Sequence, residues 1–249
     1  MMSYSLMMLL IGHLIGDFIL QSPCLVEKKE KSIGYLFLHC GLYLIPVFCV
    51  LLCFCDWLQV IIFSLIVVVS HFMFDFSKIK LNKGRGKVFD FFGFVLDQIL
   101  HVVILISLSC FMLKFNGLGE FLVKNPFTTQ KLVSCELEKA MMCLLVILSM
   151  VTFFGVFIKK LLSLIFKDQK SEDDAVSNNS AGYVIGCLER VIIIVLGMMG
   201  LYESIGLVLT AKSIARFPEC SKKGFAEKYL VGTLVSLLIA IVGILVIQA

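Results

Sequence analysis

The sequence has few charged residues and an excess of apolar ones. Only 16% of its 249 residues are Asp, Glu, Lys or Arg, 59% are hydrophobic, and the mean hydropathy is +1.00. A soluble domain of this size carries about 25% charged residues. The net charge of +4 comes from basic residues scattered between apolar runs, which is typical of membrane topology. The composition argues against an ordinary soluble domain and indicates no nucleic-acid partner.

Several diagnostic motifs are also missing. The ten cysteines form no CxxC pair and no spaced framework, so neither a disulfide scaffold nor a zinc ribbon is expected. HExxH, GxSxG and P-loop motifs are absent, which leaves a gluzincin protease or a P-loop ATPase without support. The N-terminal apolar run lacks a basic leader and contains His13 and Asp17, which is typical of a retained membrane helix.

What the sequence does contain is a series of long apolar segments. A membrane-spanning helix needs about 20 apolar residues, and the sequence predicts an all-α, polytopic integral membrane helical bundle with about seven transmembrane segments. The longest segment, 183–211, exceeds one untilted crossing, so we expect it to be broken or re-entrant near Gly197 and Gly200. The segments are 4–22, 33–55, 57–77, 91–113, 139–158, 183–211 and 229–248.

The chain is predicted to divide into two halves. Residues 1–113 form a four-helix half, 114–138 an outer loop, and 139–249 a C-terminal half with a polar linker at 159–181. The loops at 27–31 and 78–90 are rich in Lys and Arg, which places them on the cytoplasmic face.

All four histidines lie in apolar segments, and three of them stand four residues from an aspartate. An ionisable group at membrane depth costs roughly 2.5–3.5 kcal/mol, which marks it as a functional candidate. Residues four apart share one face of a helix, and the depth along each segment at ~1.5 Å per residue is similar for all of them. A single site near the cytoplasmic side is therefore expected. The seven groups are His13, Asp17, His39, His71, Asp75, Asp97 and His101.

Imidazole nitrogen and carboxylate oxygen together suit a divalent transition metal, with Zn favoured. All seven groups are candidate metal ligands; His39, His71 and His101 with Asp75 or Asp97 form the preferred set. Asp17 and Asp97 are candidate catalytic bases, and Gln21 and Gln98 are expected to orient the ligands. Two metals, or polar contacts between helices without any metal, remain alternatives. 

These residues also resemble a known pattern. The sequences His13-Leu-Ile-Gly-Asp17-Phe18-Ile-Leu-Gln21, His71-Phe-Met-Phe-Asp75 and Asp97-Gln98-Ile-Leu-His101, with His39 between them, are similar to an uncharacterised bacterial membrane family, a domain of unknown function. The resemblance extends to Gly186-Cys-Leu-Glu189-Arg190 in the C-terminal half. It implies the bacterial cytoplasmic (inner) membrane as the location and assigns no activity.

Five charged residues interrupt the apolar C-terminal half. They are either salt bridges that hold helices in register or contacts to a lipid headgroup or phosphate. They are Glu189, Arg190, Glu203, Lys212 and Arg216.

The leading functional hypothesis is a membrane-embedded metal-dependent hydrolase that acts at the cytoplasmic leaflet on a lipid-derived or amphipathic substrate. One alternative is a transporter or channel for a divalent metal or protons. Another is a non-catalytic membrane sensor or scaffold with a structural metal. Membrane lipid is the expected partner, and the oligomeric state is left open.

Overall fold

The computed structural model describes residues 4–114, 131–166, 179–221 and 224–248, and all regular elements in these ranges are helices. The all-α prediction is confirmed. The expected outer loop and polar linker fall largely on 115–130 and 167–178, outside the described residues. Their edges are helical, since one helix begins at Lys131 and another continues to Ile165.

Five helical stretches are long and apolar enough to cross a membrane. They are α3 (Ile33–Phe54), α4 (Trp57–Asn82), Lys87–Met112 of α5 (Lys87–Lys114), Glu136–Ile165 across α7 (Lys131–Val151) and α8 (Phe153–Ile165), and α11 (Phe225–Gln248). A sixth span results if Tyr4–Ile19 and Pro23–Lys29, which meet at an angle of 82°, are counted as one broken span. These helices indicate an integral membrane protein, with five or six candidate spans in the described chain where about seven were expected.

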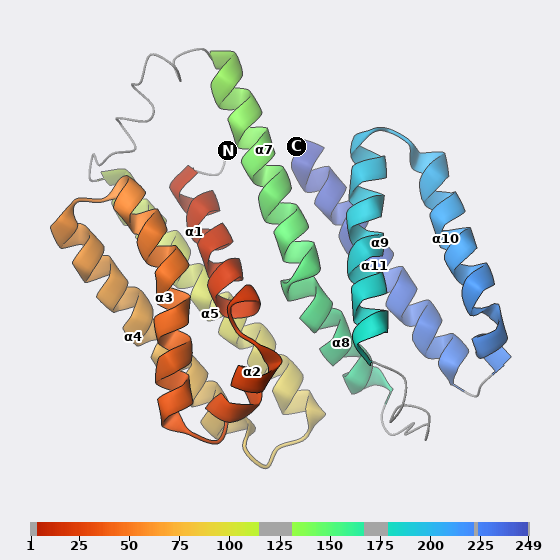
Figure 1. Cartoon of the computed structure of the whole chain (residues 1–249), viewed down its shortest axis with the longest axis horizontal. Coiled ribbons are helices and arrows are strands. Elements are labelled where there is room, and N and C mark those ends of the chain that lie inside the picture. Colours follow the sequence, from red (N-terminus) through yellow and green to blue (C-terminus); the bar gives the residue numbers. More distant parts are fainter. Residues whose placement is uncertain (1–3, 115–130, 167–178, 222–223, 249) are drawn as a thin grey trace. The chain divides into compact units, whose positions relative to one another are not determined.

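The missing span is accounted for by segment 183–211. It forms two helices, α9 (Asn179–Met198) and α10 (Tyr202–Arg216), and neither is among the candidate spans of the described chain. Gly200 between them has φ 74°, a left-handed conformation that ends α9. The predicted break is confirmed. The 15 residues of α10 are fewer than a crossing needs, and Figure 1 shows α10 running back alongside α9.

The chain forms two compact units, residues 1–145 and 146–249. In the first, α1 (Tyr4–Leu14) packs against α3 and α5, and α4 packs against the same two helices, which gives a four-helix arrangement (Figure 1). A π-helical turn, η1 (Ile15–Ile19), extends α1, and the short α2 (Pro23–Lys29) lies against α3.

The four-helix unit has an apolar half and a polar half. The apolar half forms around the C-terminal part of α3, the N-terminal part of α4 and the C-terminal part of α5, with side chains such as Val47, Leu51, Val60 and Leu105 almost fully buried. Every histidine lies outside this cluster, on the same side of the cluster's members along α1, α3, α4 and α5. The core therefore closes one end of the bundle and leaves the polar groups at the other.

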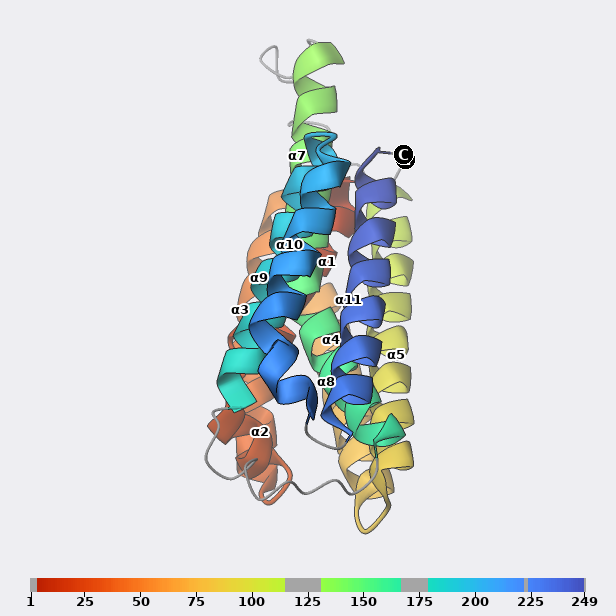
Figure 2. The ribbon, with the colours of Figure 1, turned by 90° about the vertical axis from the view of Figure 1, so that its right-hand side faces the viewer.

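The second unit consists of the end of α7 from Val146, the helices α8 to α11 and the 3-10 turn η3 (Phe217–Ser221). The helix α11 packs against α8 and α9, while α10 packs against α9; Figure 2 shows α9, α10 and α11 running lengthwise beside one another. Gly243 permits this packing, because a Cβ there would lie 2.8 Å from Met150 Cε and 3.0 Å from Val146 Cγ1.

Candidate metal centre

The polar half of the four-helix unit brings together all seven ionisable groups that the sequence singled out. They come from α1, η1, α3, α4 and α5, and each residue is buried, with at most 7% of its surface exposed. They are His13, Asp17, His39, His71, Asp75, Asp97 and His101.

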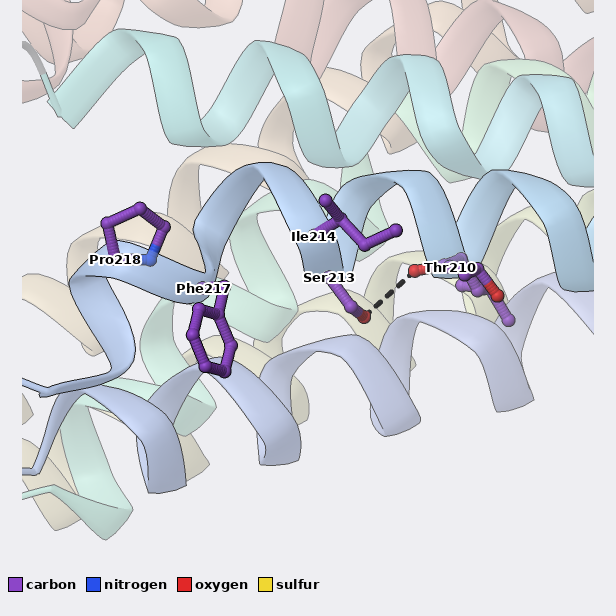
Figure 3. Close-up of a pocket in the computed structure, with 6 residues that line it drawn as sticks. Thr210, Ser213, Ile214, Phe217 and Pro218 are labelled. Atoms are coloured by element: carbon purple, nitrogen blue, oxygen red, sulfur yellow. Dashed lines mark hydrogen bonds between the residues drawn. The ribbon is translucent and has the colours of Figure 1, made fainter.

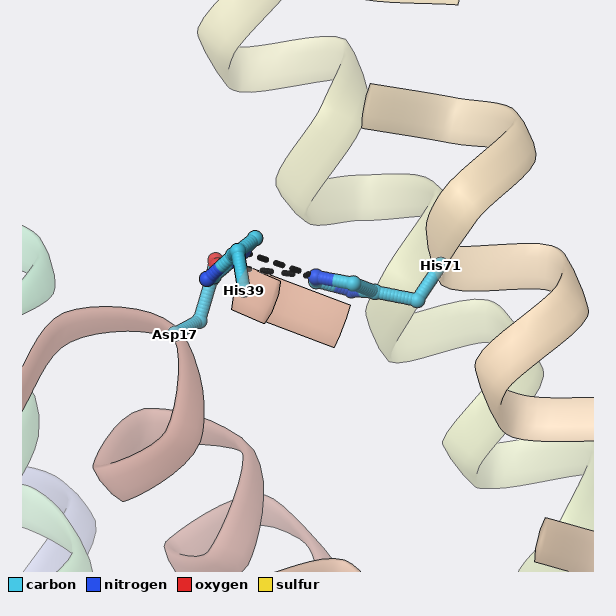
Figure 4. Close-up of side chains that lie close together, drawn as sticks. All are labelled: Asp17, His39 and His71. Atoms are coloured by element: carbon cyan, nitrogen blue, oxygen red, sulfur yellow. Dashed lines mark hydrogen bonds and ion pairs between the residues drawn. The ribbon is translucent and has the colours of Figure 1, made fainter. Parts of the chain in front are cut away.

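Three of these groups form a compact triangle of donor atoms. His39 Nε2 lies 3.0 Å from His71 Nε2 and 3.3 Å from Asp17 Oδ1, and the third edge, from His71 Nε2 to Asp17 Oδ1, is 4.0 Å. Figure 4 shows the three side chains converging from three separate elements. A point equidistant from the three atoms lies about 2.0 Å from each, which is the usual bond length from Zn to imidazole nitrogen or carboxylate oxygen. The triangle therefore has the size of a three-ligand metal site.

The hydrogen bonding of the two imidazoles also fits a cation. Their Nε2 atoms face each other, so at most one of them can donate a proton to the other. Their Nδ1 atoms are buried and have no partner among the described residues. A cation between the two Nε2 atoms would bind both lone pairs at once, with the protons on Nδ1.

Asp75 lies beside the same pair but is bound differently. Its Oδ2 is 3.3 Å from His39 Nε2 and also accepts a 2.6 Å bond from Lys29 Nζ. Its Oδ1 accepts a 2.8 Å bond from Lys78 Nζ, and Lys78 donates a second bond, of 2.7 Å, to Asp97 Oδ2. Two lysines thus neutralise two of the three aspartates.

The second carboxylate oxygen of Asp17 belongs to a hydrogen-bond network of uncharged groups. Gln98 Nε2 donates to Asp17 Oδ2 at 2.7 Å, and Gln98 Oε1 lies 3.2 Å from His13 Nε2. His13 Nδ1 in turn lies 3.2 Å from the hydroxyl of Tyr43. Gln98 therefore holds Asp17 in place, and its expected role of orienting a metal ligand stays a prediction. Gln21, with its amide nitrogen toward the Asp17 carbonyl, places its oxygen 2.7 Å from Lys29 Nζ.

His101 is a buried base next to the triangle. Its Nδ1 lies 2.7 Å from the backbone carbonyl of Asp97 and donates to it, which makes Nε2 the lone-pair atom. That Nε2 is buried and has no hydrogen-bond partner within the described chain, and neither has Asp97 Oδ1. The His101 and His71 ring centroids are 4.4 Å apart. His101 was expected as a ligand, whereas the third corner of the triangle is Asp17.

Local backbone geometry positions Asp17. Gly12 and Gly16 let α1 and η1 approach α3 closely; a Cβ on Gly16 would lie 3.0 Å from both Cα and O of Tyr43. The π-helical turn adds one residue per turn, with Leu20 N donating to Ile15 O at 2.9 Å. Such turns occur frequently at functional sites.

Sequence reasoning missed two members of this cluster, Lys29 and Lys78. Both were assigned to basic loops, because lysines near segment ends usually mark the cytoplasmic face. A signal for Lys78 was present: it lies three residues after Asp75 and so shares its helix face. The signal for Lys29 was its spacing of four from the apolar Leu25. This spacing puts both residues on one face of α2, and both are buried.

Four of the five C-terminal candidates have partners within their own unit. Lys212 Nζ pairs with Glu189 at 2.5 Å, Arg216 pairs with Glu219 at 2.6 Å, and the Arg190 Nε donates to the Met150 carbonyl. Glu203 is exposed in the first turn of α10. The Lys212–Glu189 pair joins α10 to α9 and Arg190 joins α9 to α7, whereas Arg216 and Glu219 are only three residues apart. The choice between a structural role and a lipid contact stays a prediction.

A pocket lies beside these residues on α10 and η3 (Figure 3). Leu209, Ile214, Phe217 and Pro218 give it an apolar lining. Its two hydroxyls bond within the helix, from Thr210 to the Gly206 carbonyl and from Ser213 to the Leu209 carbonyl. The pocket thus has no polar group directed at a phosphate among the residues that line it.

Helices of membrane-spanning length and a buried His/Asp cluster define a polytopic membrane protein with a candidate metal centre. Residues 5–128 match the family described as "Protein of unknown function (DUF3307)". The match covers just under half the chain and includes every residue of the cluster. It supports the resemblance to an uncharacterised family. No curated protein and no solved structure shows significant similarity to the chain.

Proposed function

We propose that the protein is a membrane-embedded, metal-dependent hydrolase. The observation that carries the proposal is the triangle of His39, His71 and Asp17, because catalytic zinc sites use three protein ligands, including sets of two histidines and one carboxylate, and keep a fourth position for water. Zn is the favoured metal. We place the protein in the bacterial inner membrane, with the site toward the cytoplasmic leaflet.

Each side chain has a distinct task in this proposal. Asp17, His39 and His71 would hold the metal, which when bound lowers the pKa of a water molecule and polarises the scissile bond. His101 Nε2 is the available acceptor for the proton of that water, since it is buried, has no hydrogen-bond partner among the described residues and is adjacent to His71. The backbone carbonyl of Asp97 accepts a hydrogen bond from His101 Nδ1, which fixes the orientation of this base. Asp17, considered as a base from the sequence, is better used as a ligand.

The substrate class follows from where the cluster lies. It is enclosed by helices that are long and apolar enough to span a membrane, and the side chains of Val69 and Met73, which face outward from α4 next to His71, are apolar and exposed. A lipid-derived or amphipathic molecule could reach such a site from the bilayer, with its polar part toward Lys78, which is 22% exposed.

A transporter is the weaker alternative. A path across the membrane needs polar groups along its whole length, and the buried cluster around Val47, Leu51, Val60, Val67 and Leu105 is apolar. The one-sided distribution of polar groups favours a site over a path.

Metal analysis tests the proposal. Purified wild-type protein should contain about one equivalent of zinc, His71→Ala should lose it, and Asp97→Asn should retain it because Asp97 is outside the triangle. A folded wild-type protein without bound metal would refute the proposal.

Activity is tested separately. Lipid esters, amides and phosphodiesters in mixed micelles should include a class that the zinc-loaded protein cleaves and the His101→Gln variant, which retains zinc, cleaves much more slowly. Stoichiometric zinc without cleavage of any of the three bond types would favour the sensor or scaffold alternative.

A further inference from the structure

Asp75 stands in almost the same relation to the two central histidines as Asp17. Its Oδ2 lies 3.3 Å from His39 Nε2 and 3.9 Å from His71 Nε2, and the corresponding distances for Asp17 Oδ1 are 3.3 and 4.0 Å. By distance alone, either carboxylate could be the third ligand, and both together with the histidines would make a four-ligand set.

The two carboxylates differ in their other partners. Asp17 Oδ1 contacts only histidines among the described groups, and its second oxygen accepts from the neutral amide of Gln98. Asp75 Oδ2, the oxygen nearest the histidines, is held by the ammonium group of Lys29 at 2.6 Å. A metal ion that used this oxygen would have to compete with a buried positive charge.

We infer that Lys29 determines the coordination number of the centre, by holding Asp75 in an ion pair and so keeping the fourth position open. Three protein ligands with one open position are typical of catalytic zinc, whereas four protein ligands are typical of structural zinc. Lys29 is in this sense a positioning residue. The inference rests on the proposed metal centre and adds the feature that separates an enzyme from a structural site.

The placement of Lys29 supports this role. Only Leu25 and Lys29 of the seven residues of α2 are buried, and Lys29 is only 6% exposed. The Ser22 hydroxyl caps the helix by accepting from Leu25 N at 3.3 Å. The ammonium group therefore reaches Asp75 from a separate short helix, which meets the preceding helical stretch Tyr4–Ile19 at an angle of 82°.

Cobalt(II) binding to the full chain in detergent tests the inference. Lys29→Met should bind Co²⁺ about tenfold more tightly or better, a change of the size that groups around metal ligands produce. Its visible spectrum should no longer respond to added thiocyanate, since Asp75 would occupy the open position. Lys28→Met is the matched control, because Lys28 is an exposed neighbour on α2, and it should behave as wild type. The double variant Lys29→Met/Asp75→Asn should return to a thiocyanate-sensitive spectrum.

The outcomes separate this inference from the proposed function. A wild type that binds no Co²⁺ overturns both. A wild type that binds Co²⁺ while Lys29→Met shows equal or weaker affinity and the same response to thiocyanate overturns the inference alone. If Lys29→Met does not fold, Asp75→Asn decides: unchanged Co²⁺ affinity supports the inference, and a loss of affinity shows that Asp75 is already a ligand and refutes it.

Discussion

Replacing Gly16 by alanine should weaken the proposed metal centre without changing any of its proposed ligands. A Cβ at this position would lie 2.9 Å from Tyr43 Cδ2 and 3.0 Å from both Cα and O of Tyr43. Carbon atoms normally approach to about 3.5 Å. Two of the three contacts are with backbone, so a rotation of the tyrosine ring cannot relieve them, and η1 must move away from α3 by about 0.5 Å.

The expected magnitude follows from this displacement. Overpacking of this kind costs about 1–3 kcal/mol, and the better helix propensity of alanine returns up to about 1 kcal/mol. Asp17 is the next residue and moves with η1. Because functional groups must be held within about 0.5 Å of their working geometry, zinc affinity should fall by about tenfold or more.

Gly12→Ala is the matched control. The added Cβ would meet Pro46 C and O at 3.5 Å, an ordinary contact, although Gly12 lies one turn before Gly16 on the same helix path. Unfolding free energy can be measured by denaturant titration in detergent, and zinc affinity by competition with a chelator. Equal stability and equal zinc affinity for the two variants would show that the close approach at Gly16 does not position Asp17.

Three further changes test other parts of the structure, each by thermal unfolding in detergent. Gly200→Ala should destabilise the second unit by about 1–2 kcal/mol, purely through the left-handed φ of 74°, because no atom lies within 4 Å of the added Cβ; no change in melting temperature would contradict this. Glu189→Gln should cost about 1–3 kcal/mol, less than for a fully buried pair because Lys212 is 18% exposed, and adding Lys212→Met should recover part of the loss; strictly additive losses would argue against the pair. Tyr43→Phe removes the hydroxyl beside His13 Nδ1 and should cost about 1 kcal/mol with zinc affinity retained; loss of zinc would make Tyr43 part of the centre.

Much of the fold could be predicted from hydropathy. The expected segment 33–55 is α3 within one residue, and the expected break in 183–211 occurs at Gly200. The segment expected at 57–77 is shorter than α4, which continues to Asn82. Hydropathy follows the apolar part of a helix and not the helix itself, so the last turns of α4, which carry Lys78, were assigned to a loop.

The site could be predicted in outline and not in detail. A spacing of four residues predicts that His71 shares a helix face with Asp75, and Asp97 with His101. In the structure His71 Nε2 lies 3.9 Å from Asp75 Oδ2, and His101 Nδ1 lies 3.6 Å from Asp97 Oδ1. The pair His13 and Asp17 is instead connected through Gln98, and Asp17 joins His39 and His71. A π-helical turn widens the helix after His13, and periodicity of 3.6 residues cannot show where such a turn occurs.

The charges of the cluster bear on how many metal ions it can hold. Three buried carboxylates, Asp17, Asp75 and Asp97, face the ammonium groups of Lys29 and Lys78, which leaves one net negative charge when the histidines are neutral. One divalent ion changes this to one net positive charge, which a bound hydroxide or an anionic substrate group can balance. Two divalent ions would leave three uncompensated positive charges in an apolar surrounding, where unpaired charge is very costly. For the proposed centre, the charges of Lys29 and Lys78 therefore favour one metal ion over the two-metal alternative.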